Sequence, residues 1–210
     1  MNENINYLAV DTSNAHMTVA ARVNGRLEYS FTADSGVRHS EQLMPTVEKL
    51  LEKMNASVND IDVFCAVTGP GSFTGIRIGV STVKGFCDAL GKKALGVTSF
   101  DTLSYNIQSG KTLAVIDANH AHFYACPYEN GVPSAAEFID AKRLEELAET
   151  YKVVTYGGAK FTVSGKPVTE VDCAAGLIKA VERNLEKASS NVNTLAPFYL
   201  RLSQAEEGRK

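Results

Sequence analysis

The sequence predicts an α/β protein of two lobes, each a mixed sheet flanked by helices. The main observation is an internal repeat, in which a strand, a polar turn, a second strand and an Asn-Gly turn recur at one constant spacing. The triplet at 9–11 corresponds to the triplet at 115–117, and the Asn-Gly pair at 24–25 corresponds to the pair at 130–131. Helix and strand patterns follow both copies, and 210 residues suffice for two small lobes that share a cleft. Matching turns and strand ends favour duplication over two unrelated hairpins.

Three strands open the first lobe. Residues 5–11 are mostly apolar and end in a polar turn, residues 16–23 form the second strand, and residues 26–32 alternate apolar and polar side chains. The Asn-Gly pair between the last two is a strong hairpin signal. A helix follows from about Ser40, which we expect to cap it, and Pro45 is expected to delay or bend its first turn.

The rest of this lobe alternates strands and helices. A buried strand covers residues 63–68. Ser72 then caps a long helix that ends near Gly91, because glycine commonly stands just beyond a helix C-terminus. A short strand at 94–97 leads to another helix that starts at Ser99.

The second half continues in the same way after the repeated hairpin. A helix at 143–150, a strand at 152–156 and a helix at 174–187 follow, and an apolar tail at 195–200 is expected to dock on a lobe.

We place the N-terminal lobe at 1–108 and the C-terminal lobe, with its docking tail, at 109–210. Two lobes that each begin with hairpin strands and continue with helix–strand units indicate the actin-like, Hsp70-like fold, in which each lobe has a ribonuclease H-like sheet. Proteins of this architecture bind ATP between their lobes.

This fold class predicts where a nucleotide cleft would lie. Asp11 and Asp117 stand at the strand ends that carry phosphate-site aspartates, and Gly157-Gly158 matches the adenine-side pair. Glycine is missing after both aspartates, although a phosphate must approach bare backbone. We therefore expect a vestigial cleft and no cofactor. The alternative is an actin-fold nucleotide-binding ATPase or small-molecule kinase.

Other chemistry has weaker support. The glycine loop at 69–79 lacks the Lys-Ser/Thr pair of a Walker loop, and Ser72 has the wrong spacing for a nucleophile elbow. His120 and His122 share a face of a strand, but no third metal ligand is evident. We expect no metal, which leaves a metallopeptidase as a third and weaker alternative.

Composition favours a cytoplasmic protein without membrane contact. The four cysteines are scattered, which favours reduced thiols over a disulfide framework. No apolar run approaches a membrane span, and the polar, acidic start does not resemble a signal peptide. The net charge is −3 and no basic cluster exceeds two adjacent residues, so we expect a partner to hold any nucleic acid.

Four motifs in order resemble one family: AVDTS at 9–13, RHSEQLMP at 38–45, TGPGSFTGIRIG at 68–79 and PFYLR at 197–201. The set resembles the TsaB (YeaZ) family, the non-catalytic subunits of the bacterial tRNA threonylcarbamoyladenosine machinery. The resemblance implies an inactive paralogue of the transferase TsaD, because the stretch at 96–103 lacks the His-x-x-x-His metal motif that TsaD carries.

The resemblance also implies partners. A TsaB subunit docks on TsaD, which transfers a threonylcarbamoyl group to N6 of the tRNA adenosine next to the anticodon, and the ATPase TsaE joins them. It implies a homodimer when the subunit is alone, contact with tRNA only through the complex, and ATP use only by partner subunits. The implied interface lies on the helices after the RHS motif and the glycine loop, and some of its residues must instead face the internal core. Its residues are Arg38, His39, Leu43, Met44, Val47, Leu50, Leu51, Met54, Gly75, Ile76, Gly79 and Thr82.

Overall fold

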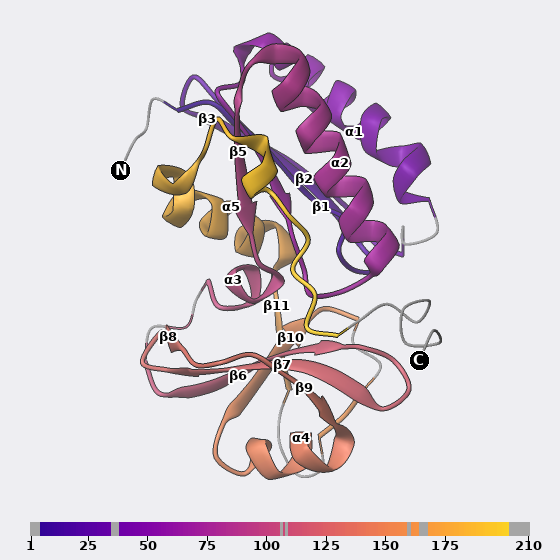
Figure 1. Ribbon diagram of the computed structural model, residues 1–210, viewed down its shortest axis with the longest axis vertical. Helices are drawn as coiled ribbons and strands as arrows, with labels where there is room; N and C mark the ends of the chain where they lie inside the picture. Colours follow the sequence, from indigo (N-terminus) through magenta and orange to yellow (C-terminus); the bar gives the residue numbers. More distant parts are fainter. Residues whose placement is uncertain are drawn as a thin grey trace.

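The computed structural model describes residues 5–34, 38–105, 107, 109–158, 161–163 and 168–201, and these form two lobes (Figure 1). The first lobe contains a five-stranded sheet with the order β3-β2-β1-β4-β5. Its strands are β1 (Tyr7–Asp11), β2 (Met17–Val23), β3 (Arg26–Thr32), β4 (Val63–Val67) and β5 (Lys93–Val97). Strand β1 pairs antiparallel with β2 and parallel with β4, so the sheet is mixed.

The second lobe repeats this arrangement. Its six-stranded sheet has the order β11-β10-β6-β7-β8, and β9 also pairs with β7. The strands are β6 (Lys111–Asp117), β7 (His122–Glu129), β8 (Val132–Pro133), β9 (Glu137–Asp140), β10 (Lys152–Tyr156) and β11 (Val168–Val171). As in the first lobe, the central strand β6 pairs antiparallel with β7 and parallel with β10. The repeated topology confirms the predicted two-lobed, actin-like fold class, although the sequence prediction missed β11.

The two Asn-Gly turns explain how the repeat is preserved at backbone level. Asn24 and Gly25 have φ of 50° and 78°, and Asn130 and Gly131 have φ of 52° and 80°. Two successive left-handed residues make the tight turn whose twist matches that of antiparallel strands. Asparagine and glycine adopt this conformation at the lowest cost.

Helices α1 (His39–Lys53) and α2 (Phe73–Leu90) cover one face of the first sheet. Ser72 caps α2 as predicted, because its Oγ accepts a hydrogen bond from Gly75 N at 3.2 Å, and Gly91 ends the helix with φ of 64°. The predicted start of α1 was wrong. It begins at His39 with no side-chain cap, and it continues through Pro45. Burial of its first turn against the lobe outweighs the hydrogen bond that proline cannot make.

The other face of the first sheet is covered by α5 (Cys173–Asn184), a helix from the second half of the chain (Figure 1). Leu177 and Val181 of α5 pack in one cluster with Tyr7 and Leu95 of the first sheet. Short helix α3 (Ser99–Leu103) packs against α5 between the lobes, and α4 (Ala141–Ala148) lies on the second sheet. The predicted boundary between residues 108 and 109 stays a prediction.

The last described segment packs first on the first lobe and then, through Phe198 and Leu200, on the second. The short 3₁₀ turns η2 (Leu185–Lys187) and η3 (Val192–Thr194) follow α5, and η1 (Val58–Asp60) precedes β4. Leu195 is buried in the same core as α1 and α2, and Phe198 N donates to Thr68 O at 2.7 Å. The predicted docking of the tail is therefore confirmed. Within the described ranges, no helix combines the length and apolar character needed to span a bilayer.

Candidate functional site: a filled cleft and an exposed two-helix face

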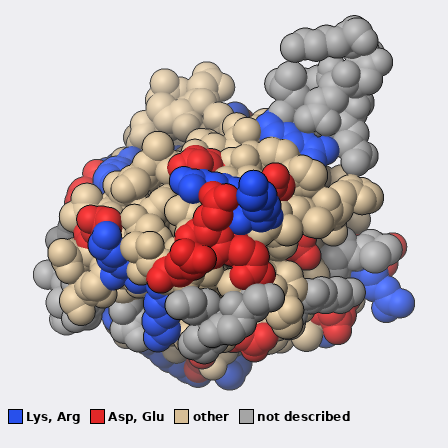
Figure 2. Space-filling view, turned by 90° about the horizontal axis from the view of Figure 1, so that it is seen from below, with Lys and Arg blue, Asp and Glu red and all other residues tan. Residues whose placement is uncertain are grey.

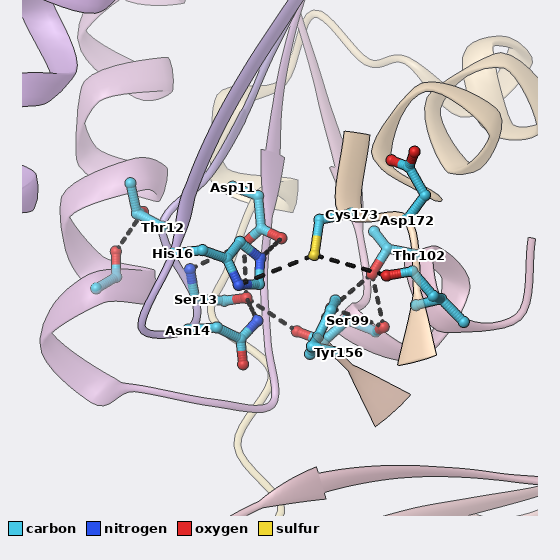
Figure 3. Close-up of polar contacts among 12 residues, drawn as sticks. Asp11, Thr12, Ser13, Asn14, His16, Ser99, Thr102, Tyr156, Asp172 and Cys173 are labelled. Atoms are coloured by element: carbon cyan, nitrogen blue, oxygen red, sulfur yellow. Dashed lines mark hydrogen bonds and ion pairs between the residues drawn. The ribbon is translucent and has the colours of Figure 1, made fainter. Parts of the chain in front are cut away.

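Asp11 is the last residue of β1, and its carboxylate lies inside a closed polar cluster between the lobes (Figure 3). Its Oδ1 accepts hydrogen bonds from Ser13 N at 2.9 Å and Ser13 Oγ at 2.6 Å. Its Oδ2 lies 3.7 Å from His16 Nε2, which makes an ion pair rather than a hydrogen bond. Asp11 is 1% exposed and His16 is 6% exposed, so the pair is shielded from solvent.

The two ionisable groups hold each other in their charged forms. Burial alone would raise the pKa of Asp11 and lower that of His16. The opposite charge of each partner outweighs burial, together with the hydrogen bonds of Ser13 to Asp11 and the contact of Cys173 with His16. The pKa of Asp11 is therefore lowered, and that of His16 is raised to about 10. The positive charge that faces Asp11 comes from the protein's own histidine.

The cluster extends into the second lobe through Tyr156 of β10. The Tyr156 hydroxyl lies 2.6 Å from Thr102 Oγ1 and donates to Ser99 O at 3.1 Å. Ser99 Oγ in turn donates to Ser13 Oγ at 3.2 Å. Burial raises the pKa of Tyr156 well above its usual value, so its hydroxyl keeps its proton.

Two further contacts close the cluster around His16. The ring of Tyr156 meets the His16 ring edge-on, with centroids 5.0 Å apart. Cys173, at the start of α5, places Sγ 4.0 Å from His16 Nδ1. The strand-end turn of the first lobe is thus joined to both β10 and α5.

The glycine loop packs on the same turn. Ser72 N donates to Ser13 O at 2.7 Å, and Thr12 Oγ1 donates to Gly75 O at 2.7 Å. A Cβ atom at Gly75 would lie 1.9 Å from Thr12 O, and one at Gly79 would lie 2.7 Å from Thr12 Oγ1. Gly75 therefore admits the backbone of Thr12 and Gly79 admits its side chain, so both glycines face their own lobe. Their assignment to a groove for another chain is corrected on this ground.

The other residues of the predicted nucleotide cleft have hydrogen-bond partners outside this cluster. Asp117 is exposed at the end of β6, where its Oδ1 accepts from Asn119 N at 2.7 Å. Gly157 and Gly158 are exposed after β10, and Gly158 N donates to Glu170 Oε1 at 3.2 Å. In the described ranges, no hydrogen bond or ion pair joins Asp117 or the glycine pair to Asp11. Within the described residues, the phosphate-side Asp117 and the adenine-side Gly157 and Gly158 are therefore not bonded to the Asp11 cluster.

The histidine pair does not form a metal centre with other side chains. His122 Nδ1 contacts the backbone oxygen of His120 at 2.8 Å, and the His122 ring stacks on Phe138 with centroids 5.0 Å apart. Across the part of the chain that the structure describes, no group of three or more His, Cys, Asp or Glu side chains could hold a metal ion.

Most of the predicted partner-interface residues are internal. Those buried in the first lobe are His39, Leu43, Val47, Leu50, Leu51, Met54, Ile76, Gly75 and Gly79. Burial is also the main reason that the pKa of His39 is lowered. The outward residues are Arg38, Met44 and the half-buried Thr82, and Met44 keeps 48% of its surface exposed. The α1–α2 face, meaning the solvent side of these two helices, thus has Met44 as its large exposed apolar side chain.

Sequence reasoning missed the residues that fill the cleft. His16, Ser99, Thr102, Tyr156 and Cys173 come from separate elements and converge only in the fold. One signal was available in the sequence. His16 precedes a strand that pairs antiparallel with β1, so it lies near Asp11 across the turn.

Comparison with known proteins places the chain in a family. A family model described as TsaD, tRNA N6-adenosine threonylcarbamoyltransferase, matches residues 34–162, which is more than half of the chain. A protein of Escherichia coli named tRNA threonylcarbamoyladenosine biosynthesis protein TsaB is 31% identical over 76% of this chain and 74% of its own. The chain belongs to the TsaB family. A TsaB protein of Bacillus subtilis is 29% identical over 95% of both chains.

Solved structures agree with this assignment at the level of the fold. YeaZ from Pseudomonas aeruginosa matches with a TM-score of 0.76 and 21% identity, over 93% of this chain and 100% of its own. A second P. aeruginosa structure, described as similar to the peptidase YeaZ, gives a TM-score of 0.77 over 94% of this chain. These two structures therefore share the two-lobed architecture described above.

Proposed function

We propose that this TsaB family member is a non-catalytic scaffold in the biosynthesis of threonylcarbamoyladenosine on tRNA. It docks through its α1–α2 face on a TsaD-like paralogue, which performs the threonylcarbamoyl transfer, and a TsaE-like ATPase joins the pair. The observation that carries the proposal is the contrast between a filled cleft and an exposed helix face. When no TsaD-like partner is present, the same face pairs two copies.

The filled cleft supports a role without catalysis. Asp11 is the aspartate that would hold metal and phosphate in a nucleotide-binding relative, and here His16 and Ser13 satisfy it. The amide of Ser72, at the start of α2, donates to Ser13 O rather than facing open space. A helix N-terminus attracts anions only when its N–H groups are free to reach them. ATP is consequently used by partner subunits and not by this chain.

The α1–α2 face supports docking by a helical surface. Met44 is unbranched and adapts to irregular partner surfaces. The exposed Glu41 and Glu48 stand one turn to either side of Met44 on α1, and Arg38 and Lys49 add exposed basic groups to the same helix and its N-terminus. An apolar centre with a polar rim is the usual composition of a protein–protein interface.

Charge supports the expectation that tRNA is held by a partner. The chain has a net charge of −3. Figure 2 shows one end of the molecule, where acidic side chains are interspersed with basic ones. On α4, for example, Arg143 Nη1 pairs with Glu146 Oε2 at 3.1 Å. Mixed charge of this kind gives little of the electrostatic attraction on which RNA binding depends.

Reconstitution tests the proposal. The adenylate-forming enzyme, TsaD, TsaE, ATP, threonine, bicarbonate and unmodified tRNA are combined with and without this chain. We expect modified tRNA only when the chain is present, and none from the chain alone. Equal modification in its absence, or modification by the chain alone, overturns the scaffold role.

A pair of variants locates the docking surface. Met44→Glu places a charge on the α1–α2 face, while Val132→Glu changes another exposed apolar residue, 66% exposed, on β8. We expect Met44→Glu to weaken binding to immobilised TsaD at least tenfold and Val132→Glu to leave it unchanged, with unaltered circular dichroism in both. Equal binding by both variants rejects this face.

Titration with Mg–ATP separates the scaffold from an actin-fold ATPase or kinase. We expect no heat of binding at micromolar nucleotide. Micromolar binding that disappears in Asp11→Ala contradicts the proposal and moves the cleft to the centre of the function.

A further inference from the structure

Strand β3 carries a row of exposed apolar side chains on one face. Leu27, Tyr29 and Phe31 are 39%, 55% and 48% exposed. They are alternate residues of one strand, so they point to the same side of the sheet. Half of the large exposed apolar residues among the described part of the chain thus stand on this one strand. We call these three residues the β3 row.

The β3 row lies on the α5 side of the sheet, away from the α1–α2 face. Leu27, Tyr29 and Phe31 pair with Arg22, Ala20 and Thr18 of β2. Ala20 belongs to the cluster that α5 covers, whereas its neighbours Val19 and Ala21 belong to the cluster under α1 and α2. A partner on the β3 row therefore leaves the proposed docking face free.

Charged groups border the row rather than interrupt it. Arg22 pairs with Glu182 of α5, and Lys179 Nζ lies 3.1 Å from the same carboxylate. On the opposite face of β3, Glu28 is held by Arg26 at 2.8 Å and by Lys53 at 2.6 Å. The charges next to β3 are already paired within the chain, so a partner strand need not supply opposite charges for them.

Strand β3 is also an edge. It stands at the end of the order β3-β2-β1-β4-β5, and its only strand partner in the described residues is β2. An edge strand presents backbone N–H and C=O groups that can pair with another strand. The β3 row and the edge together offer both parts of a strand-addition site, main-chain hydrogen bonds and alternate apolar side chains.

We propose that β3 pairs antiparallel with β3 of a second copy about a two-fold axis at Tyr29. Directly opposite residues share a face, so each allowed register sets the row against the partner's row. With Tyr29 opposite Tyr29, Leu27 faces Phe31, Glu28 faces Ser30 and Arg26 faces Thr32, so the whole strand is used. With the axis at Glu28, the Glu28 carboxylates of the two copies would face each other. With the axis at Ser30, the paired segment would run past Thr32, where β3 ends. Charge and strand length select the Tyr29 register.

A cysteine cross-link tests this geometry on the full chain. Opposite residues in antiparallel strands have Cα atoms about 4.5–5.5 Å apart, which a disulfide can span. Under mild oxidation we expect Tyr29→Cys to form a disulfide-linked dimer on a non-reducing gel. Ser30→Cys is the matched control, because in this register it faces Glu28 and not itself. The four native cysteines are buried and contribute a background that the wild type measures.

Sedimentation velocity provides the second measurement, and it uses the Met44→Glu background so that the α1–α2 face cannot pair two copies and pairing through β3 is measured alone. An interface of one strand pair is small, so we expect a reversible dimer at tens of micromolar protein. Tyr29→Lys should raise the dissociation constant at least tenfold, whereas Val132→Lys should leave it unchanged. A monomer at all concentrations in the Met44→Glu background, equal cross-linking of Ser30→Cys, or cross-linking through Met44→Cys with none through Tyr29→Cys overturns the proposal. Those outcomes leave the reconstitution result intact, so the two proposals fail separately.

Discussion

Asp11 and His16 form a buried ion pair, with Oδ2 of the aspartate 3.7 Å from Nε2 of the histidine. The pair stands at the strand end where this fold class places a phosphate-site aspartate. The protein thereby supplies its own cation to a carboxylate that a nucleotide-binding relative would leave for metal and phosphate. The pair lies in the first lobe, and Tyr156 of β10 in the second lobe packs on the His16 ring with centroids 5.0 Å apart.

The first prediction concerns the pH dependence of stability. The folded pKa of His16, about 10, lies above its unfolded value of 6.5, so its contribution is complete below pH 6.5 and is lost as pH rises towards 10. The folded pKa of Asp11 lies below 3.8, so its contribution is complete above that value and is lost in acid. The pair therefore stabilises the fold most between about pH 4 and 6.5.

Urea unfolding across this pH range checks the prediction with His16→Gln. At pH 6 the variant should lose about 3–5 kcal/mol, since it leaves Asp11 buried without its partner. The difference between wild type and variant should shrink above pH 6.5, and taking the difference removes other groups that titrate in alkali. A difference that stays constant from pH 6 to 10 would show that His16 is neutral in the folded protein.

The second prediction uses two glycines of α2. Gly75→Ala should destabilise the protein by several kcal/mol or prevent folding, because its Cβ would lie 1.9 Å from the backbone oxygen of Thr12. Gly85→Ala has open space around its Cβ and should stabilise the helix by about 0.5–1 kcal/mol. Thermal unfolding of both variants measures the difference, and similar midpoints would mean that α2 does not pack so closely on Thr12.

Features of the fold that depend on neighbouring residues could be predicted from the sequence, and features that depend on tertiary contacts could not. The hairpins, the cap at Ser72 and the stop at Gly91 depend on neighbouring residues, and they were predicted. Strand β11 was missed because its four residues show only weak alternation between buried and exposed side chains. Its place in the sheet is set by parallel pairing with β10, a tertiary contact. The start of α1 was misplaced because burial of His39, a tertiary effect, outweighs the local preference for Ser40 as a cap.

The candidate site was only half predictable for the same reason. Asp11 stands out at the end of an apolar strand, but the side chains that close the cluster around its neighbours Ser13 and His16 come from β10, α3 and α5. The spacing of Gly75 and Gly79 indicates a close approach of backbone without saying which backbone, and that ambiguity placed them at an interface with another chain. The Cβ positions resolve it in favour of Thr12.

The third prediction tests the link between the lobes. Tyr156→Phe removes a hydroxyl that contacts Thr102 Oγ1 at 2.6 Å and Ser99 O at 3.1 Å, both buried. The loss should be about 1–3 kcal/mol, because two buried contacts of the hydroxyl are removed, while Thr102 Oγ1 still donates to Ser99 O at 2.8 Å. Tyr151→Phe is the control, since its hydroxyl bonds to an exposed Glu129, and it should cost less than about 0.5 kcal/mol. Equal losses in denaturant unfolding would refute a special role for Tyr156.

The last prediction concerns the tail, where Leu195 is 2% exposed in the core beneath α1 and α2. Its Cδ1 would lie 3.1 Å from a Cβ on Gly96, so it fills the space that this glycine leaves on β5. Leu195→Ala should therefore cost about 2–5 kcal/mol through the cavity it creates. Val192→Ala, at a partly buried position beside the same core, removes fewer atoms and should cost clearly less. If chemical denaturation shows the two variants to be equally stable, the tail is an accessory strap and the first lobe folds without it. If Leu195→Ala has the lower free energy of unfolding, residues far apart in sequence complete one core. Truncations before Leu195 should then fail to yield a stable first lobe.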